Sequence, residues 1–396
     1  MTGRSQTRYI PMAYFDSLAE ARRTLRENSL LSLEFQTELL DWMGRPASLE
    51  SYAGFMRVYG YVRIEDDDAR RTHGEHLHGI VKTILRNAST YYVSPDMCEY
   101  VKMGAEAMPA TGLKPTDLPS DTGFLLYDRP VSIMSELPAT KDDGEVVMTT
   151  VETRVAGVAW QAGSVKKAPV INGNGQAPGF TEQGELTQGV SYYLFCTPHD
   201  MAVQLNQTQA QCGEDPVNEE MDVRRIHGPL PIYDFSGWAY NMPWFSTDEN
   251  RGYSVVEGVE GEQEPLAGVH SLVDQGRRLI LATWRILKQE NVVVLDPNRP
   301  PRHMRRRGER AGIRSDEDIV IIRMRKEVYE GLQQAVEREG DEPWYTCRFW
   351  VQGHWHNYWV GPKGEQHIVE KFVGPYLKGP DGAPLHKNRK IVSLEE

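Results

Sequence analysis

The chain has 396 residues, of which 40% are hydrophobic and 25% are charged, and this composition argues against a disordered protein. Its length allows two or three hydrophobic cores. The net charge of -12 argues against attraction of nucleic acid to the whole surface.

The apolar runs and the cysteines indicate a cellular compartment. The longest apolar runs, 292–295 and 319–322, are too short to cross a bilayer, and no charged and then apolar leader begins the sequence. We therefore expect a cytoplasmic protein with no membrane partner. The cysteines lie far apart without CxxC spacing, so we expect reduced thiols rather than disulfides or a zinc site. They are Cys98, Cys196, Cys212 and Cys347.

The charge is divided unevenly along the chain. Residues 1–298 hold 26 Lys and Arg against 41 Asp and Glu, whereas residues 299–396 hold 18 against 15. The segment 299–314 alone has seven arginines and one glutamate. One basic segment is therefore embedded in an acidic protein.

Residues 1–110 are predicted to form a helical layer. Apolar residues recur at helical spacing from position 18 to 43, and a nearly ideal stripe runs from about 75 to 88. The sequence Gly44-Arg45-Pro46 should end the first helix, and a third helix is expected over 95–108.

Residues 111–298 are predicted to form a β-rich α+β domain that ends in a helix. Short β-branched and aromatic runs at 123–127, 146–160 and 190–196 indicate a mainly antiparallel sheet. The polar stretches 163–189, 206–223 and 238–253 are expected to be loops that form the walls of a cleft. The final helix is expected over 266–289, with Trp284 in the core.

The last hundred residues divide into a basic segment and a small domain. Residues 299–317 show no apolar period, so we expect a basic linker or arm. Residues 318–396 are expected to form a C-terminal α+β domain, with a strand at 318–325, a helix at 328–338 and a hairpin. The whole chain is thus assigned to the α+β class.

The stretch 348–360 holds five aromatic residues and two histidines, and we interpret it as one strand. The turn Gly361–Gly364 and the partner strand 366–373 complete a hairpin, with His367 expected near His354 and His356. Two histidines at i and i+2 lie about 7 Å apart and could share a metal. A third ligand is required, and a solvated sheet face explains the pair more simply, so we nominate no metal site. A strand of this kind predicts Phe349, Val351, Trp355 and Trp359 on one face, and Trp350, Gln352, His354, His356 and Tyr358 on the other.

The C-terminal pattern resembles a known group of proteins. Trp350-Val-Gln-Gly-His-Trp355, a turn, Gly374-Pro-Tyr-Leu-Lys-Gly-Pro-Asp-Gly-Ala-Pro-Leu385 and a short strand near Ile391 resemble the end of uncharacterised proteins of actinobacteria and their phages. Similar stretches at 118–131, around Trp284, in the basic segment and at 319–325 extend the resemblance over most of the chain after about Tyr91. The group commonly has arginine at position 356, which leaves His354 as the matching residue. The resemblance implies a phage or mobile-element setting and no particular reaction.

The favoured hypothesis is a nucleic-acid-associated protein that contacts phosphates of DNA or RNA through residues 299–314. The five arginines nominated for this role are Arg302, Arg305, Arg306, Arg307 and Arg310. The exposed face of 348–360 would serve as a flat support.

Two other hypotheses stay open. A toxin-like nuclease or phosphoesterase would use His354 for proton transfer and Tyr358 to position the substrate, with the arginines stabilising the phosphoryl charge. His354 is the better catalytic candidate because the small Gly353 leaves room beside it. Alternatively, the acidic front of the chain binds another protein. The signatures of P-loops, zincins, α/β-hydrolases and kinases are missing, and no pattern identifies a cofactor.

Overall fold

The structure is a computed structural model of the chain. It describes residues 18–59, 67–109, 111–140, 146–166, 186–211, 219–240, 267–314, 318–325, 328, 349–351, 353–362 and 366–378. The expected helix at 328–338, most of the loops expected at 163–189 and 238–253, and Cys212 and Cys347 lie outside these residues.

In the described part of the chain, one large mixed sheet has the strand order β5-β4-β3-β2-β1-β7-β6. Strand β1 (Ser89–Val93) is parallel to both of its neighbours, β2 (Thr122–Thr140) and β7 (Ile319–Met324). The other neighbouring pairs are antiparallel. These outer strands are β3 (Val146–Lys166), β4 (Leu186–Phe195), β5 (Ile232–Ala239) and β6 (Val293–Asn298).

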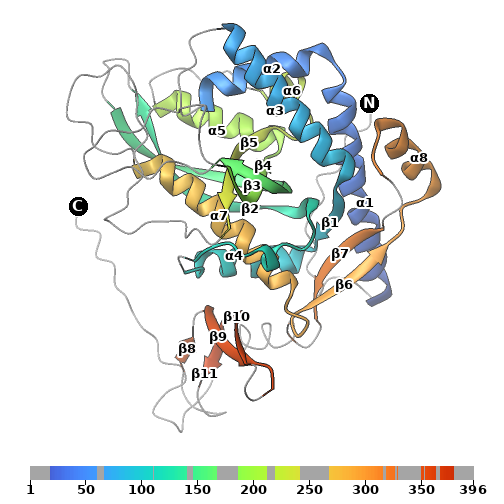
Figure 1. The fold of residues 1–396 in the computed structure, drawn as a ribbon, viewed down its shortest axis with the longest axis vertical. Coiled ribbons are helices and arrows are strands. Elements are labelled where there is room, and N and C mark those ends of the chain that lie inside the picture. The colour runs from blue at the N-terminus through green and yellow to red at the C-terminus, as the bar shows by residue number, and fades with distance from the viewer. Residues whose placement is uncertain are drawn as a thin grey trace.

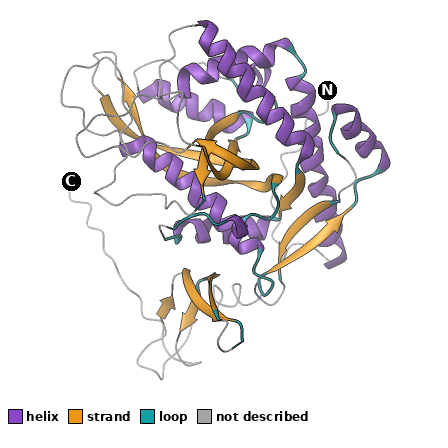
Figure 2. Ribbon diagram, viewed as in Figure 1, coloured by secondary structure: helices purple, strands orange, loops and turns teal. Residues whose placement is uncertain are grey.

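Helices cover both faces of this sheet (Figures 1 and 2). Successive residues of a strand point to opposite faces, and four of the five residues of β1 are buried because helices cover both faces. In β1, Tyr91 and Val93 join the core under α4 and α7, whereas Tyr92 joins the core under α1 and α3. The helices are α1 (Leu18–Met43), α2 (Pro46–Tyr59), α3 (Asp67–Asn87), α4 (Pro95–Glu106), α5 (Pro198–Gln211), α6 (Glu220–His227), α7 (Ala267–Leu287) and α8 (Arg302–Ala311).

The α+β class and most of the strongly periodic elements are confirmed. Helices α1, α3, α4 and α7 and strands β2, β3, β4 and β7 form where the patterns predict them, and Trp284 is 1% exposed. The helical layer of the first 110 residues is interrupted, however, by β1 in the interior of the sheet. The expected loop at 206–223 is wrong at both ends, because α5 continues to Gln211 and α6 begins at Glu220.

The predicted domain boundaries do not separate different sheets. Strand β1 comes from the predicted helical region, β2 to β6 from the predicted middle domain, and β7 from the predicted C-terminal domain. All of them belong to the same sheet. The pairing of β1 with β7 joins residues more than 200 positions apart, which local composition does not reveal.

One buried and one half-buried histidine attach α2, a helix that was not predicted from the sequence. His78 of α3 is 8% exposed, and its Nε2 lies 3.0 Å from the carbonyl oxygen of Met43 and 3.1 Å from the hydroxyl of Ser48. Nδ1 of His227 lies 3.0 Å from the hydroxyl of Ser51. Burial lowers the pKa of both histidines, and the nearby Lys82 lowers the pKa of His78 further.

We predict that these histidines make the protein less stable in mild acid. Below pH about 6.5 an unfolded histidine takes up a proton that the folded one resists, so the free energy of unfolding falls as the pH falls. The measurement is urea unfolding at several pH values between 7.5 and 5.5, for the wild type and for the double variant His78→Gln/His227→Gln. The variant should lose less stability over this range. The comparison cancels contributions from other groups, and equal pH slopes would contradict the prediction.

Candidate nucleic-acid interface

The basic segment is a helix, not a linker. Residues 302–311 form α8, which packs on α1. Met304, Gly308 and Ala311 face inward, with Gly308 next to Leu33 of α1. Their spacing of four and three residues is helical, and this was the apolar signal that sequence analysis overlooked. It is weak because two of the three residues are small.

Both ends of α8 are well defined. Pro300 and Pro301 precede it, and a proline there lacks only an N–H that the first turn leaves unbonded in any case. At the other end Gly312 has a φ of 91° in the left-handed region. The amide of Gly312 donates to Glu309 and that of Ile313 donates to Gly308, which is a Schellman ending. The chain then continues along α3, where the amide of Arg314 donates to the Arg86 carbonyl at 3.1 Å.

Docking of the apolar face turns the arginines of α8 toward solvent. Arg302, Arg306 and Arg310 are exposed and recur every four residues, so they form a stripe along the outer face with a rise of about 6 Å per step. Arg305 lies at the flank, is half-buried, and donates from Nε to the Pro300 carbonyl at 3.2 Å. The five nominated arginines therefore occupy different environments.

Arg307 has a carboxylate partner within the chain. Its guanidinium lies 3.7 Å from the carboxylate of Asp41, and the two side chains are 51% and 50% exposed. Exposed pairs of this kind contribute about 1 kcal/mol or less, so this contact holds Arg307 only weakly. Among the described residues, Arg302, Arg306 and Arg310 form no ion pair. The stripe is thus not neutralised by the described carboxylates of the acidic chain.

The aromatic stretch forms two strands rather than one. Strand β8 (Phe349–Val351) ends before Gly353 and pairs with β11 (Tyr376–Lys378). Strand β9 (His354–Val360) pairs with β10 (His367–Val373), which confirms the predicted hairpin. The break places β8 and β9 in separate two-stranded sheets, so the single strand expected over 348–360 is wrong.

The hairpin separates the histidines. In the observed register His354 faces Val373 at one end, and His367 faces Val360 at the other. Six residue steps along the strand separate them, about 20 Å. His367 is therefore no third ligand for His354 and His356, whose rings lie 6.4 Å apart. Among the described residues, no group of three or more His, Cys, Asp and Glu is placed to hold a metal ion.

Gly353 leaves no room for a ligand. A Cβ at this position would lie 2.6 Å from the ring of Phe372 and 3.4 Å from Pro375. The space beside His354 is thus filled by the protein itself, which removes the reason for preferring His354 as a catalytic residue. Phe372 is 2% exposed and packs on Tyr100 of α4, with ring centroids 5.1 Å apart.

Helix α8 lies beside α1, away from the hairpin, which contacts α7 (Figure 1). Helix α8 packs with α1 in one core, and Phe372 of the hairpin belongs to the other core, together with α4 and α7. The arginines of α8 therefore do not stabilise a phosphoryl group held at His354 or Tyr358. The combined nuclease site expected from the sequence is not assembled.

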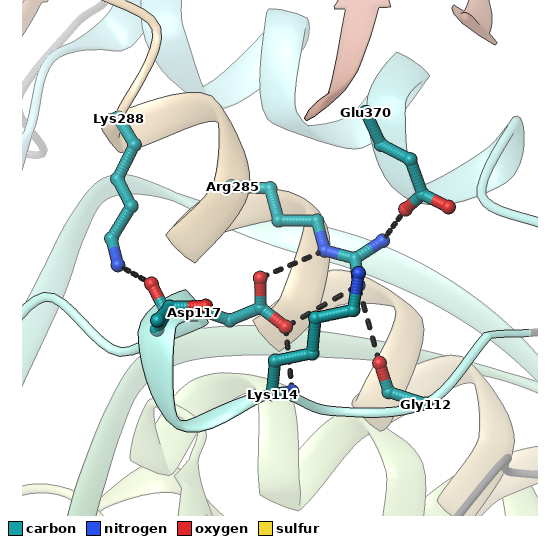
Figure 3. A network of polar contacts seen from close by, with 7 residues as sticks. Gly112, Lys114, Asp117, Arg285, Lys288 and Glu370 are labelled. Carbon is teal, nitrogen blue, oxygen red and sulfur yellow. Dashed lines mark hydrogen bonds and ion pairs between the residues drawn. The ribbon is translucent and has the colours of Figure 1, made fainter. Parts of the chain in front are cut away.

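A buried arginine joins the hairpin to helix α7 (Figure 3). Arg285 of α7 donates to both carboxylate oxygens of Asp117 at 3.2 and 3.3 Å, and to the Gly112 carbonyl at 3.2 Å. It also pairs with Glu370 of β10. The side chains of Arg285, Asp117 and Glu370, which we call the Arg285 cluster, are 5%, 12% and 24% exposed.

The turn that carries Asp117 is fixed by its own hydrogen bonds. Asp117 ends the 3-10 helix η2 (Pro115–Asp117) and accepts from the Lys114 amide at 2.8 Å. Lys288 donates to the Thr116 carbonyl. This cluster was not predicted from the sequence. One signal for a buried charge was visible, because Arg285 interrupts an otherwise apolar helical run next to Trp284.

Comparisons with known proteins do not extend these observations. No family model matches the chain, and no match was found among curated proteins. Within the described ranges, no helix has both the length and the apolar character needed to cross a bilayer.

We predict that Asp117→Asn lowers the free energy of unfolding by about 3 kcal/mol, because it leaves a buried guanidinium without its main counter-charge. Chemical denaturation followed by circular dichroism measures this loss. The matched control is Asp222→Asn, which removes the partner of Arg225 in a pair whose side chains are 53% and 77% exposed. That change should cost less than about 1 kcal/mol. Similar losses in both variants would contradict a special role for the Arg285 cluster.

Proposed function

We propose that the protein binds the phosphate backbone of nucleic acid through the outer face of α8. The observation that carries this proposal is the stripe of Arg302, Arg306 and Arg310 on a docked helix, with no ion-pair partner among the described residues. Guanidinium groups form strong, charge-assisted hydrogen bonds with phosphate oxygens. A docked helix holds these groups in a fixed row, so less side-chain and backbone freedom is lost on binding than in a free arm.

The overall charge of -12 restricts where a polyanion can approach. Acidic surfaces repel it, and exposed charges more than about 10 Å apart are largely screened at moderate salt. Binding therefore depends on local charge, and the stripe on α8 supplies such a location. DNA and RNA share the phosphate group, so the proposal names nucleic acid as a class. The implied phage or mobile-element setting is compatible with this role.

An acidic protein is the competing partner for the same arginines. A polyanion without bases or sugars, such as poly-glutamate, distinguishes the two cases. If poly-glutamate binds and DNA and RNA do not, the nucleic-acid proposal fails and a protein partner replaces it.

We predict that the triple variant Arg302→Gln/Arg306→Gln/Arg310→Gln binds DNA and RNA at least about 10-fold more weakly at low salt. Each phosphate contact contributes about 0.9 to the slope of log affinity against log salt for a duplex, so the slope should fall by roughly 2 to 3. Fluorescence anisotropy with labelled oligonucleotides at several salt concentrations measures both quantities.

The control for this experiment is a variant with the same change in net charge elsewhere. Arg23, Arg71 and Arg225 are exposed and pair with Glu27, Glu50 and Asp222. Replacing these three by glutamine should leave the affinity and the salt slope nearly unchanged. If the two triple variants behave alike, binding follows total charge and not the face of α8.

A further inference from the structure

We infer that the β9–β10 hairpin is a second contact surface for nucleic acid, one that stacks unpaired bases on His356 and Tyr358. This rests on the proposed function only in that both surfaces would serve the same polymer. The two surfaces differ in chemistry: α8 presents charge to phosphates, and the hairpin presents rings to bases. They can therefore be tested separately.

The pleat of the hairpin sorts its side chains onto two faces. Residues directly opposite each other in an antiparallel pair point to the same side. The inner face carries Trp355, Asn357, Trp359, Ile368, Glu370 and Phe372. The outer face carries His354, His356, Tyr358, Val360, His367, Val369, Lys371 and Val373.

At the end of the hairpin near Trp355 and Phe372, the inner face packs against the rest of the protein. Phe372 is buried, and Trp355 donates from Nε1 to the Gly104 carbonyl of α4 at 2.9 Å. Glu370 joins Arg285. These contacts hold the hairpin so that its outer face is turned away from α4 and α7.

The outer face presents a row of rings. Ring centroids of His354 and His356 lie 6.4 Å apart, and those of His356 and Tyr358 lie 4.7 Å apart. His354 also lies 6.4 Å from Tyr376 of β11. His356 is exposed and Tyr358 is 41% exposed, so ring surface remains available to a ligand.

The charge of this face suits a polyanion. Lys371 places its ammonium 5.9 Å from the centre of the Tyr358 ring, and none of the eight outer-face residues is acidic. This is notable in a chain with 56 Asp and Glu. Proteins that bind single strands without strict sequence preference combine positive charge with exposed aromatic rings, because every base has a face that stacks.

Single strands fit this surface better than duplexes. In a duplex the faces of the bases are already stacked on one another, whereas an unpaired base offers both faces. The expected ligand of the hairpin is therefore single-stranded DNA or RNA.

The test compares two labelled 20-residue oligonucleotides by fluorescence anisotropy. One is oligo-dT, and the other is an abasic chain with the same phosphates and no bases. We expect the wild type to bind oligo-dT more tightly than the abasic chain. Tyr358→Ala and His356→Ala should each weaken oligo-dT binding by roughly 5- to 100-fold and leave abasic binding unchanged. Tyr358→Phe, which keeps the ring, should bind oligo-dT like the wild type.

The matched control is Trp359→Ala. Trp359 is the neighbour of Tyr358 in the same strand, lies on the inner face and is 66% exposed at the tip. Its loss should not affect oligo-dT binding. The inference is overturned if the wild type binds both oligonucleotides equally, or if Trp359→Ala weakens oligo-dT binding as much as Tyr358→Ala.

The two proposals fail in different ways. If the α8 triple variant binds both oligonucleotides like the wild type while Tyr358→Ala weakens only oligo-dT, the role of α8 is wrong and the stacking surface stands. If the α8 variant loses affinity for both oligonucleotides while Tyr358→Ala changes neither, α8 binds phosphates and the hairpin does not bind bases.

Discussion

Burial of the interior strand β1 on both faces is the constraint on which the rest of this structure depends. Because Tyr91 and Tyr92 point to opposite sides, the sheet needs a helical layer on each side to exclude water from both. The layer with α1 and α3 receives α8, and the layer with α4 and α7 receives the hairpin. The two proposed contact surfaces are therefore separated by the thickness of the sheet.

The Arg285 cluster joins the hairpin to this framework by charge rather than by apolar area alone. Removing a guanidinium from water is costly, and here the cost is offset by a bidentate carboxylate, a second carboxylate and a carbonyl group. An apolar contact tolerates small shifts, but this arrangement requires α7, η2 and β10 to meet in one geometry. We interpret the cluster as a device that specifies the position of the hairpin, beyond its contribution to stability.

Sequence patterns predicted the elements with a strong period and missed those whose signal was short or diluted. Strand β1 has only five residues and lies between two helices, so its short run was predicted as part of the helical layer. Helix α8 presents only Met304, Gly308 and Ala311 to the core, and the many arginines masked this period. Four of the five nominated arginines are exposed and Arg305 is half-buried. Nothing local to the sequence could show that Phe372 fills the space beside Gly353. The positions of β1 and α8 and the packing beside Gly353 depend on contacts between residues that are distant in the sequence.

The side chains of β9 point alternately to the outer and the inner face, and this limits which sequence changes the hairpin can accept during evolution. Substitutions on the outer face leave the packing of Trp355 and Phe372 untouched, so the outer residues are free to vary in chemistry. An insertion or deletion of one residue after Gly353 would exchange the two faces, turning His356 and Tyr358 inward and the tryptophans outward. Homologous chains should therefore keep the length of this strand even where its outward residues differ.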